Sequence, residues 1–258
     1  MDTVASRDGT RIAFETSGAG PALLLVTGAL SDRSVALTVR AALDAHFTLF
    51  AYDRRGRGDS GDTAPCAPER ELEDLGAVLD VAGSGAFVYG HSSGAILSLR
   101  AAMSGQSMGK LAVMEPPFIV PGMRPLPPAD VTSRLTSLVA AGDRAGALRV
   151  FLTEQVGIPA AAVSQMAASP LWARMLKLAH TVPYDSAIAS TGELPAALAR
   201  VAIPTLLLHG GRSFPWIGET ARTIAKTIPG AEFAVLEGQD HSPAPEVLAP
   251  ALVRFFLG

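Results

Sequence analysis

Short apolar runs alternate with longer amphipathic segments along most of the chain. Runs of four or five residues with almost no charge suit strands that are buried on both faces of a parallel sheet. Six such runs are present, at residues 22–26, 48–52, 86–89, 111–114, 205–208 and 232–236. Two further strands, at residues 3–6 and 11–16, flank the turn signal Asp8-Gly9 and predict a β-hairpin.

The segments between these runs have helical spacing. Leu72, Leu75 and Leu79 fall on one face of a helix, and acidic residues load its first turns, where they complement the positive end of the helix dipole. Strand, helix and strand in repetition predict an α/β fold with a mostly parallel central sheet flanked by helices.

The alternation breaks between Pro116 and Arg200. A proline-rich entry segment is followed only by helix-like stretches, at residues 130–141, 143–156, 159–168 and 171–179. We therefore predict a single domain over residues 1–258, with a small helical lid inserted at about residues 117–199 over one end of the sheet.

Composition narrows the class of protein. The chain has 258 residues, of which 48% are hydrophobic and 17% charged, with a net charge of −3. The high hydrophobic fraction and the low net charge exclude intrinsic disorder, and the slightly acidic net charge argues against the basic stripe that a nucleic-acid binder needs. The single cysteine, Cys66, forms no internal disulfide and no cysteine-based zinc site. No apolar run is long enough to span a membrane, and no signal peptide is visible, so we expect a soluble cytoplasmic protein.

The strongest chemical motif is Gly-x-Ser-x-Gly at residues 90–94. It follows a buried apolar run and precedes a helical pattern. In that context the motif predicts a tight, strained turn that exposes the hydroxyl of Ser92 above a helix N-terminus. The alternative is a glycine-rich turn in which the serine only caps a helix.

These motifs resemble the α/β-hydrolase family over nearly the whole chain. The resemblance is to small actinobacterial-type serine hydrolases, a group that includes esterases, lactonases and cofactor-free haloperoxidase-like proteins. It is carried by VTGA at residues 26–29, YDRRGRGDS at 52–60, GHSSG at 90–94 and GQDH at 238–241. The family places its nucleophile, acid and histidine in that order along the chain.

A serine hydroxyl needs a base, and five histidines are available. Only His241 combines the position after the last strand with the family's order. His46, His91, His180 and His209 are interpreted as structural.

The acid departs from the family's pattern. Most members carry an aspartate shortly after the seventh strand, but the resemblance places Ser213 there. Glu115, after the preceding strand, is a carboxylate at the carboxyl edge of the sheet, and some lactonases and dehalogenases resemble this arrangement. We predict that Glu115 is the acid. Asp240, no acid at all, and a merely structural Glu115 remain alternatives.

The resemblance also implies an oxyanion hole and a pocket. Two backbone N–H groups, of Ala29 and Ser93, are the candidate donors. Side chains of the insertion and the loop after the seventh strand would form an apolar pocket wall, although packing of the insertion explains them equally well. The candidates are Phe118, Trp172, Met175 and Trp216.

Two other patterns carry less weight. Gly56–Gly61 is a G-x-G-x-x-G sequence, but a separate segment divides it from the next helix, so it does not predict dinucleotide binding. No metal-ligand cluster is evident, and we expect no cofactor and no metal.

The sequence thus predicts a serine hydrolase that cleaves a small apolar ester, lactone or thioester through Ser92, His241 and Glu115. The alternatives are a non-hydrolytic reaction on the same residues, such as perhydrolysis, C–C cleavage or a lyase reaction, and a ligand-binding protein with a degraded site. We expect no nucleic-acid or membrane partner. The oligomeric state stays open.

Overall fold

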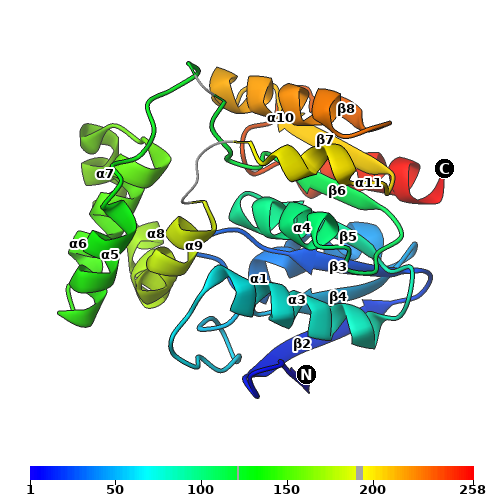
Figure 1. Cartoon of the computed structure of the whole chain (residues 1–258), viewed down its shortest axis with the longest axis horizontal. Helices are drawn as coiled ribbons and strands as arrows, with labels where there is room; N and C mark the ends of the chain where they lie inside the picture. Colours follow the sequence, from blue (N-terminus) through cyan, green and yellow to red (C-terminus); the bar gives the residue numbers. More distant parts are fainter. Residues whose placement is uncertain (121, 190–193) are drawn as a thin grey trace.

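The computed structural model describes residues 1–120, 122–189 and 194–258. Within them, one eight-stranded sheet has the order β1-β2-β4-β3-β5-β6-β7-β8 (Figure 1). Its strands are β1 (Asp2–Ala5), β2 (Arg11–Gly18), β3 (Ala22–Val26), β4 (Thr48–Tyr52), β5 (Phe87–His91), β6 (Leu111–Met114), β7 (Thr205–Gly210) and β8 (Glu232–Leu236).

The strand directions agree with the hydrophobic pattern. β1 and β2 form the predicted antiparallel hairpin, and β2 also pairs antiparallel with β4. From β4 to β8 every pairing is parallel. The six predicted buried runs are all strands, which confirms the α/β fold with a mostly parallel sheet.

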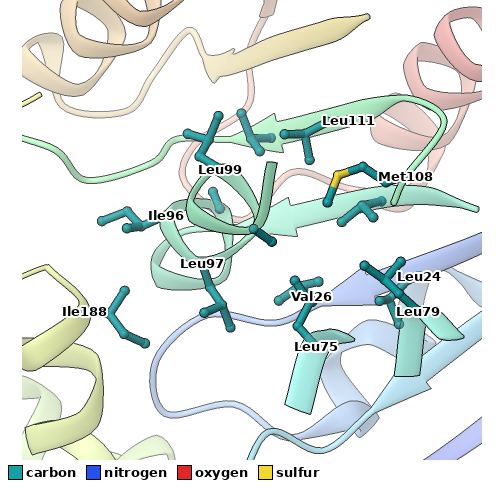
Figure 2. Close-up of a cluster of buried hydrophobic side chains, with 14 of the residues drawn as sticks. Leu24, Val26, Leu75, Leu79, Ile96, Leu97, Leu99, Met108, Leu111 and Ile188 are labelled. Carbon is teal, nitrogen blue, oxygen red and sulfur yellow. The ribbon is translucent and has the colours of Figure 1, made fainter. Parts of the chain in front are cut away.

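Helices cover both faces of the sheet. Successive residues of a strand point to opposite sides, and because the inner strands carry apolar residues on both sides, both faces are buried. On β3, Leu24 belongs to one core cluster and Leu23 and Leu25 to the other. The first cluster packs against α3 (Pro68–Ala82), α4 (Ser93–Met103) and α10 (Pro215–Thr227), and Figure 2 shows part of it. The second packs against α2 (Arg40–Leu43) and α11 (Pro245–Leu257), near α1 (Arg33–Ala36) and the short η1 (Leu37–Val39).

The described chain between β6 and β7 contains helices and no strand, and most of these helices lie beyond one end of the sheet (Figure 1). They have a hydrophobic core of their own, built around residues such as Leu135, Leu148 and Trp172. The elements are α5 (Val131–Ala140), α6 (Arg144–Val150), the π-helix η2 (Phe151–Val156), α7 (Ala160–Ala167), α8 (Pro170–Leu178), η3 (Ala179–Thr181), α9 (Val182–Ile188) and η4 (Ala196–Arg200).

Four helical stretches were predicted in this segment, and each contains a helix. The second differs in detail, since it is divided between α6 and the π-helix η2, and α9 was not predicted. Residues 121 and 190–193 of the predicted insertion lie outside the described residues. No helix in the described ranges combines the length and the apolarity needed to cross a membrane.

Candidate active site

Ser92 occupies a strained turn between β5 and α4. Its φ of 56° and ψ of −122° lie in a region of backbone conformation that residues other than glycine rarely adopt. The turn is crowded: a Cβ on Gly28 would lie 2.8 Å from the Cβ of Ser92, and one on Gly94 would collide with the carbonyls of Val26 and Thr27. The strand–turn–helix context that the motif predicts is therefore present, and glycine is required where the neighbouring backbone approaches.

Backbone strain is concentrated at this end of the sheet. Of the described residues other than glycine, Leu30, Ser92 and Glu115 have positive φ, at 56°, 56° and 49°. Such conformations cost about 1–3 kcal/mol each and persist where the surrounding structure holds them. All three follow neighbouring strands of the sheet, so the strain marks one location.

The structure brings Glu115 and His241 into direct contact. Glu115 follows β6, and its Oε2 lies 2.5 Å from Nδ1 of His241, which lies in the loop between β8 and α11. The Glu115 side chain is fully buried, whereas that of His241 is 42% exposed. The carboxylate thus fixes one nitrogen of the ring and leaves Nε2 available to another partner.

The Glu115 carboxylate accepts three further hydrogen bonds. Gly210 N–H and the His209 ring donate to Oε1, each at 2.9 Å, and the Ser213 hydroxyl donates to Oε2 at 2.9 Å. Burial raises the pKa of Glu115, but hydrogen bonds from His241, Gly210 and Ser213 outweigh it, so the pKa lies below its ordinary value. An ionised carboxylate is what the orientation of an imidazolium requires.

Sequence reasoning gave His209 and Ser213 no part in this arrangement. His209 was interpreted as structural. Ser213 was interpreted as a neutral residue at the position where the resemblance implies an aspartate. In the structure both contact the Glu115 carboxylate. The available signal was their position at the end of β7 and in the loop that follows it, because β7 pairs directly with the strand that Glu115 follows.

Asp240, the alternative acid, is turned away from the histidine. Its carboxylate accepts the N–H of Ser242 at 2.9 Å. The loop is held instead by His91, whose Nε2 lies 2.7 Å from the carbonyl oxygen of His241. Burial and the nearby His241 lower the pKa of His91 to about 4, so His91 is neutral at neutral pH and donates this hydrogen bond.

The backbone N–H groups of Ala29 and Ser93 have no acceptor among the described residues. Ala29 follows β3, and Ser93 is the first residue of α4, where a helix leaves its N–H groups unpaired. Both residues line the same cavity as Ser92. The two N–H groups are therefore free to bind an oxygen that enters it.

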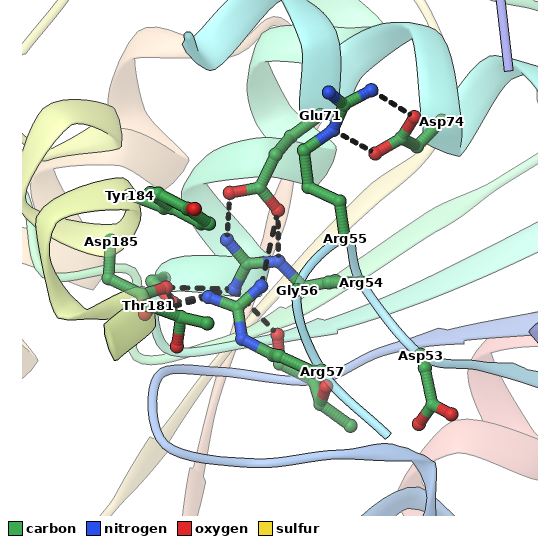
Figure 3. A network of polar contacts seen from close by, with 12 residues as sticks. Asp53, Arg54, Arg55, Gly56, Arg57, Glu71, Asp74, Thr181, Tyr184 and Asp185 are labelled. Carbon is green, nitrogen blue, oxygen red and sulfur yellow. Dashed lines mark hydrogen bonds and ion pairs between the residues drawn. The ribbon is translucent and has the colours of Figure 1, made fainter. Parts of the chain in front are cut away.

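A buried cluster of charges lies beside the turn (Figure 3). Asp185 of α9 accepts hydrogen bonds from Arg54 at 2.9 Å, Arg57 at 2.8 Å and the Ser93 hydroxyl at 2.8 Å. Glu71 of α3 pairs with Arg54 at 2.6 Å and 2.8 Å. Burial raises the pKa of Asp185, yet attraction to Arg57 and Arg54 brings it below its ordinary value. The cluster ties the helical segment to the sheet next to Ser93.

One cavity of about 320 Å³ joins these groups. Its wall includes Ser92 and His241 from the sheet side and residues of η2 from the helical segment. Most of the remaining wall is apolar, and its polar side chains include Arg124, Gln155 and Asp185. The apolar members include Ile119, Phe151, Leu152, Val156, Ile158, Phe214, Trp216 and Ile217.

Only one of the four predicted pocket residues lines this cavity, namely Trp216. The structure places Phe118 in the core between the sheet and its helices, where it is 1% exposed. Trp172 and Met175 belong to the core of the helical segment. The prediction is corrected for these three, because Trp172 and Met175 are buried among the segment's own helices and Phe118 is buried against the sheet domain, so that none of them reaches the cavity.

The glycine-rich stretch after β4 forms a closed turn. Gly56 N–H donates to the carbonyl of Gly61 at 2.9 Å, and the Asp53 carboxylate accepts the N–H of Asp59 at 2.8 Å. The next helix begins only at Pro68. The turn therefore does not run into a helix N-terminus, as a dinucleotide-binding turn does.

Comparison with known proteins identifies the family of the chain. A family model described as "Alpha/beta hydrolase family" matches residues 23–252. A solved alpha/beta hydrolase from Sphaerobacter thermophilus is 51% identical, with a TM-score of 0.94 over 99% of this chain and 100% of that one. The enol-lactonase from Burkholderia xenovorans, 18% identical with a TM-score of 0.77 over the whole of both chains, shares the fold. The N-formylmaleamate deformylase of Pseudomonas putida is 32% identical over 114 residues, which are 43% of this chain and 42% of that protein.

The family match extends over most of the sheet and the helical segment, and it includes Ser92, Glu115 and His241 within its range. The resemblance seen in the sequence is thereby confirmed. The chain belongs to the alpha/beta hydrolase family.

Proposed function

We propose that the protein is a serine hydrolase that cleaves a carboxylic ester, lactone or thioester. Ser92 is the nucleophile, His241 the base, and Glu115 the acid that orients His241. One observation carries the proposal: Glu115 holds Nδ1 of His241 at 2.5 Å, while His241 and Ser92 line the same cavity.

The proposed reaction has two steps. Nε2 of His241 takes the hydroxyl proton of Ser92 while the Ser92 oxygen attacks the substrate carbonyl. The N–H groups of Ala29 and Ser93 bind the oxyanion that forms. The bond to the leaving group breaks, the leaving group takes the proton from His241, and the acyl group stays on Ser92. Water, activated by His241, then releases the acid and restores Ser92. In this scheme the helical segment at about residues 117–199 serves as a lid that keeps the cavity apolar.

Ser92→Ala tests the nucleophile. The variant should lose hydrolysis of 4-nitrophenyl butyrate and labelling by a fluorophosphonate probe, because only an activated serine reacts with that probe. Ser104→Ala, at the other end of α4, is the matched control and should retain both. Near-normal turnover by Ser92→Ala would refute the assignment. Absence of probe labelling in the wild type would favour a ligand-binding protein.

Glu115→Gln tests the acid. By analogy with the loss of a triad acid, kcat should fall by roughly 10⁴-fold. Asp240→Asn is the control and should change kcat little, because its carboxylate binds the Ser242 N–H rather than the histidine. A larger loss in Asp240→Asn than in Glu115→Gln would contradict the assignment.

A further inference from the structure

Arg124 places a cationic side chain in the wall of the apolar cavity. It is half-buried and lies in the segment between β6 and α5. Its guanidinium donates to the carbonyls of Val156 at 2.8 Å and Gln155 at 3.0 Å, and it stacks over the Trp216 ring at 4.8 Å. These contacts fix the position of the group without neutralising its charge.

No carboxylate pairs with Arg124 among the described residues. The buried Arg54, Arg55 and Arg57, in contrast, each pair with at least one. Asp185, the carboxylate among the described residues of the cavity wall, is occupied by Arg54 and Arg57. Burial lowers the pKa of Arg124, as expected for a cation without a counter-charge. The cavity therefore contains one positive charge that the described protein does not compensate.

Gln155 supplies a second donor to the wall of the same cavity. Its side-chain oxygen accepts the hydroxyl of Ser186 at 2.9 Å, and Ser186 in turn bonds Thr132 at 2.7 Å. The amide nitrogen of Gln155 has no acceptor among the described residues, although the residue lines the cavity. The residue lies in the π-helix η2, a type of irregularity that is frequent at functional sites.

We propose that Arg124 and Gln155 form a subsite for a carboxylate on the substrate. The preferred substrates are then esters or lactones with an apolar middle and a negatively charged end distant from the scissile carbonyl. A carboxylate in this cavity could accept from the Arg124 guanidinium and from the Gln155 amide, and charge-assisted hydrogen bonds from a guanidinium are among the stronger ones. This inference rests on the proposed function, because it names the substrate class of the same site.

A pair of esters of equal length tests the subsite. 4-Nitrophenyl pentanoate is neutral, and mono-4-nitrophenyl glutarate carries a carboxylate at the far end of its acyl chain. The wild type should have the higher kcat/KM for the glutarate ester. Arg124→Met should lower that kcat/KM by about 10- to 100-fold and leave the pentanoate value within about threefold, as expected for losing one charged hydrogen-bonding partner.

Two variants separate charge from architecture. Arg124→Lys keeps the charge but not the paired bonds to the η2 carbonyls, so it should retain part of the preference for the glutarate ester. Arg144→Met, at the exposed start of α6, is the matched control and should leave the preference unchanged. Equal loss on both esters in Arg124→Met, or no preference in the wild type, would overturn the proposal.

Failure of the proposed function can be distinguished from failure of this inference. If the wild type hydrolyses neither ester, the proposed function is wrong. The subsite is then judged by calorimetric binding of monomethyl glutarate. Binding by the wild type that weakens at least tenfold in Arg124→Met would support the subsite, whereas no binding or equal binding would overturn it.

Discussion

Asp185 joins α9 to three groups of the buried cluster. Its carboxylate accepts from Arg54, Arg57 and the Ser93 hydroxyl, all at 2.8–2.9 Å, and the residue is 2% exposed. Asp185→Asn preserves the shape of the side chain and removes its charge. Two buried guanidinium groups would then share the one remaining carboxylate of Glu71.

The magnitude follows from this geometry. Removal of one partner from a buried ion pair costs about 3–5 kcal/mol, since a buried charge loses its compensation. For a chain of this size each 1 kcal/mol lowers Tm by about 2–4 °C, so Asp185→Asn should lower it by roughly 6–20 °C. The pair Arg222–Glu219 on the surface of α10 should contribute only about 0–1 kcal/mol.

Urea unfolding followed by circular dichroism measures the difference, with Glu219→Gln as the control. The Asp185 pKa lies below its ordinary value of 3.8, so the folded state binds a proton less tightly than the unfolded chain. Its contribution is therefore present above pH 4 and is lost as pH falls through the folded pKa. The wild type and Asp185→Asn should differ at pH 7 and converge as the pH falls below the ordinary pKa of 3.8. A difference under about 1 kcal/mol at pH 7 would show that the cluster is not what holds α9 to the sheet.

Three further outcomes are expected. The His91 pKa of about 4 lies below its ordinary 6.5, so the unfolded chain takes up a proton that the folded one does not; unfolding free energy should fall by up to about 2 kcal/mol between pH 7.5 and 5. His91→Gln should remove much of that slope, and an unchanged slope in urea titrations would contradict the reasoning. Burial raises the pKa of Cys66 to about 12, so iodoacetamide at pH 8 should label the native protein much more slowly than the urea-unfolded chain, and equal rates would contradict it. Ser213→Asp should lower kcat in the wild type and raise it in Glu115→Gln, as ester hydrolysis by the four proteins of the cycle would report.

The sheet could be predicted because strands β3 to β8 are nearly free of charge and, apart from the helical segment between β6 and β7, alternate with amphipathic segments. α9 was missed for a physical reason. It has only seven residues, and its Asp185 and Ser186 face inward to bind buried partners, so it lacks the apolar stripe by which a helix is recognised. Arg54 was seen only as part of the family resemblance for a different reason. Its partner Asp185 lies 131 residues away in the sequence, so no local pattern connects the two.

That Ser92, Glu115 and His241 lie at one edge of the sheet could be predicted from the sequence, because each of them follows the end of a strand. The pocket wall could not be predicted, since it depends on how the helical segment packs. Trp172 is a large apolar side chain of the kind that lines pockets, but it lies in the core of the helical segment. Arg124 and Gln155 have no periodic or motif signal, and they become meaningful only where the cavity brings them together.

The expected reversal at Ser213 follows from the positions of the two neighbouring strands. The Ser213 hydroxyl lies 2.9 Å from Glu115 Oε2, the same oxygen that holds His241 at 2.5 Å. A carboxylate at residue 213 would thus reach the region of the histidine from the end of β7. Beside an ionised, fully buried Glu115 it would be a like charge that raises one pKa and displaces the ring. Beside a neutral glutamine it would restore the missing charge. The effect of Ser213→Asp on kcat should therefore be a decrease in the wild type and an increase in Glu115→Gln. An effect of the same sign in both would show that residue 213 is not an alternative position for the acid.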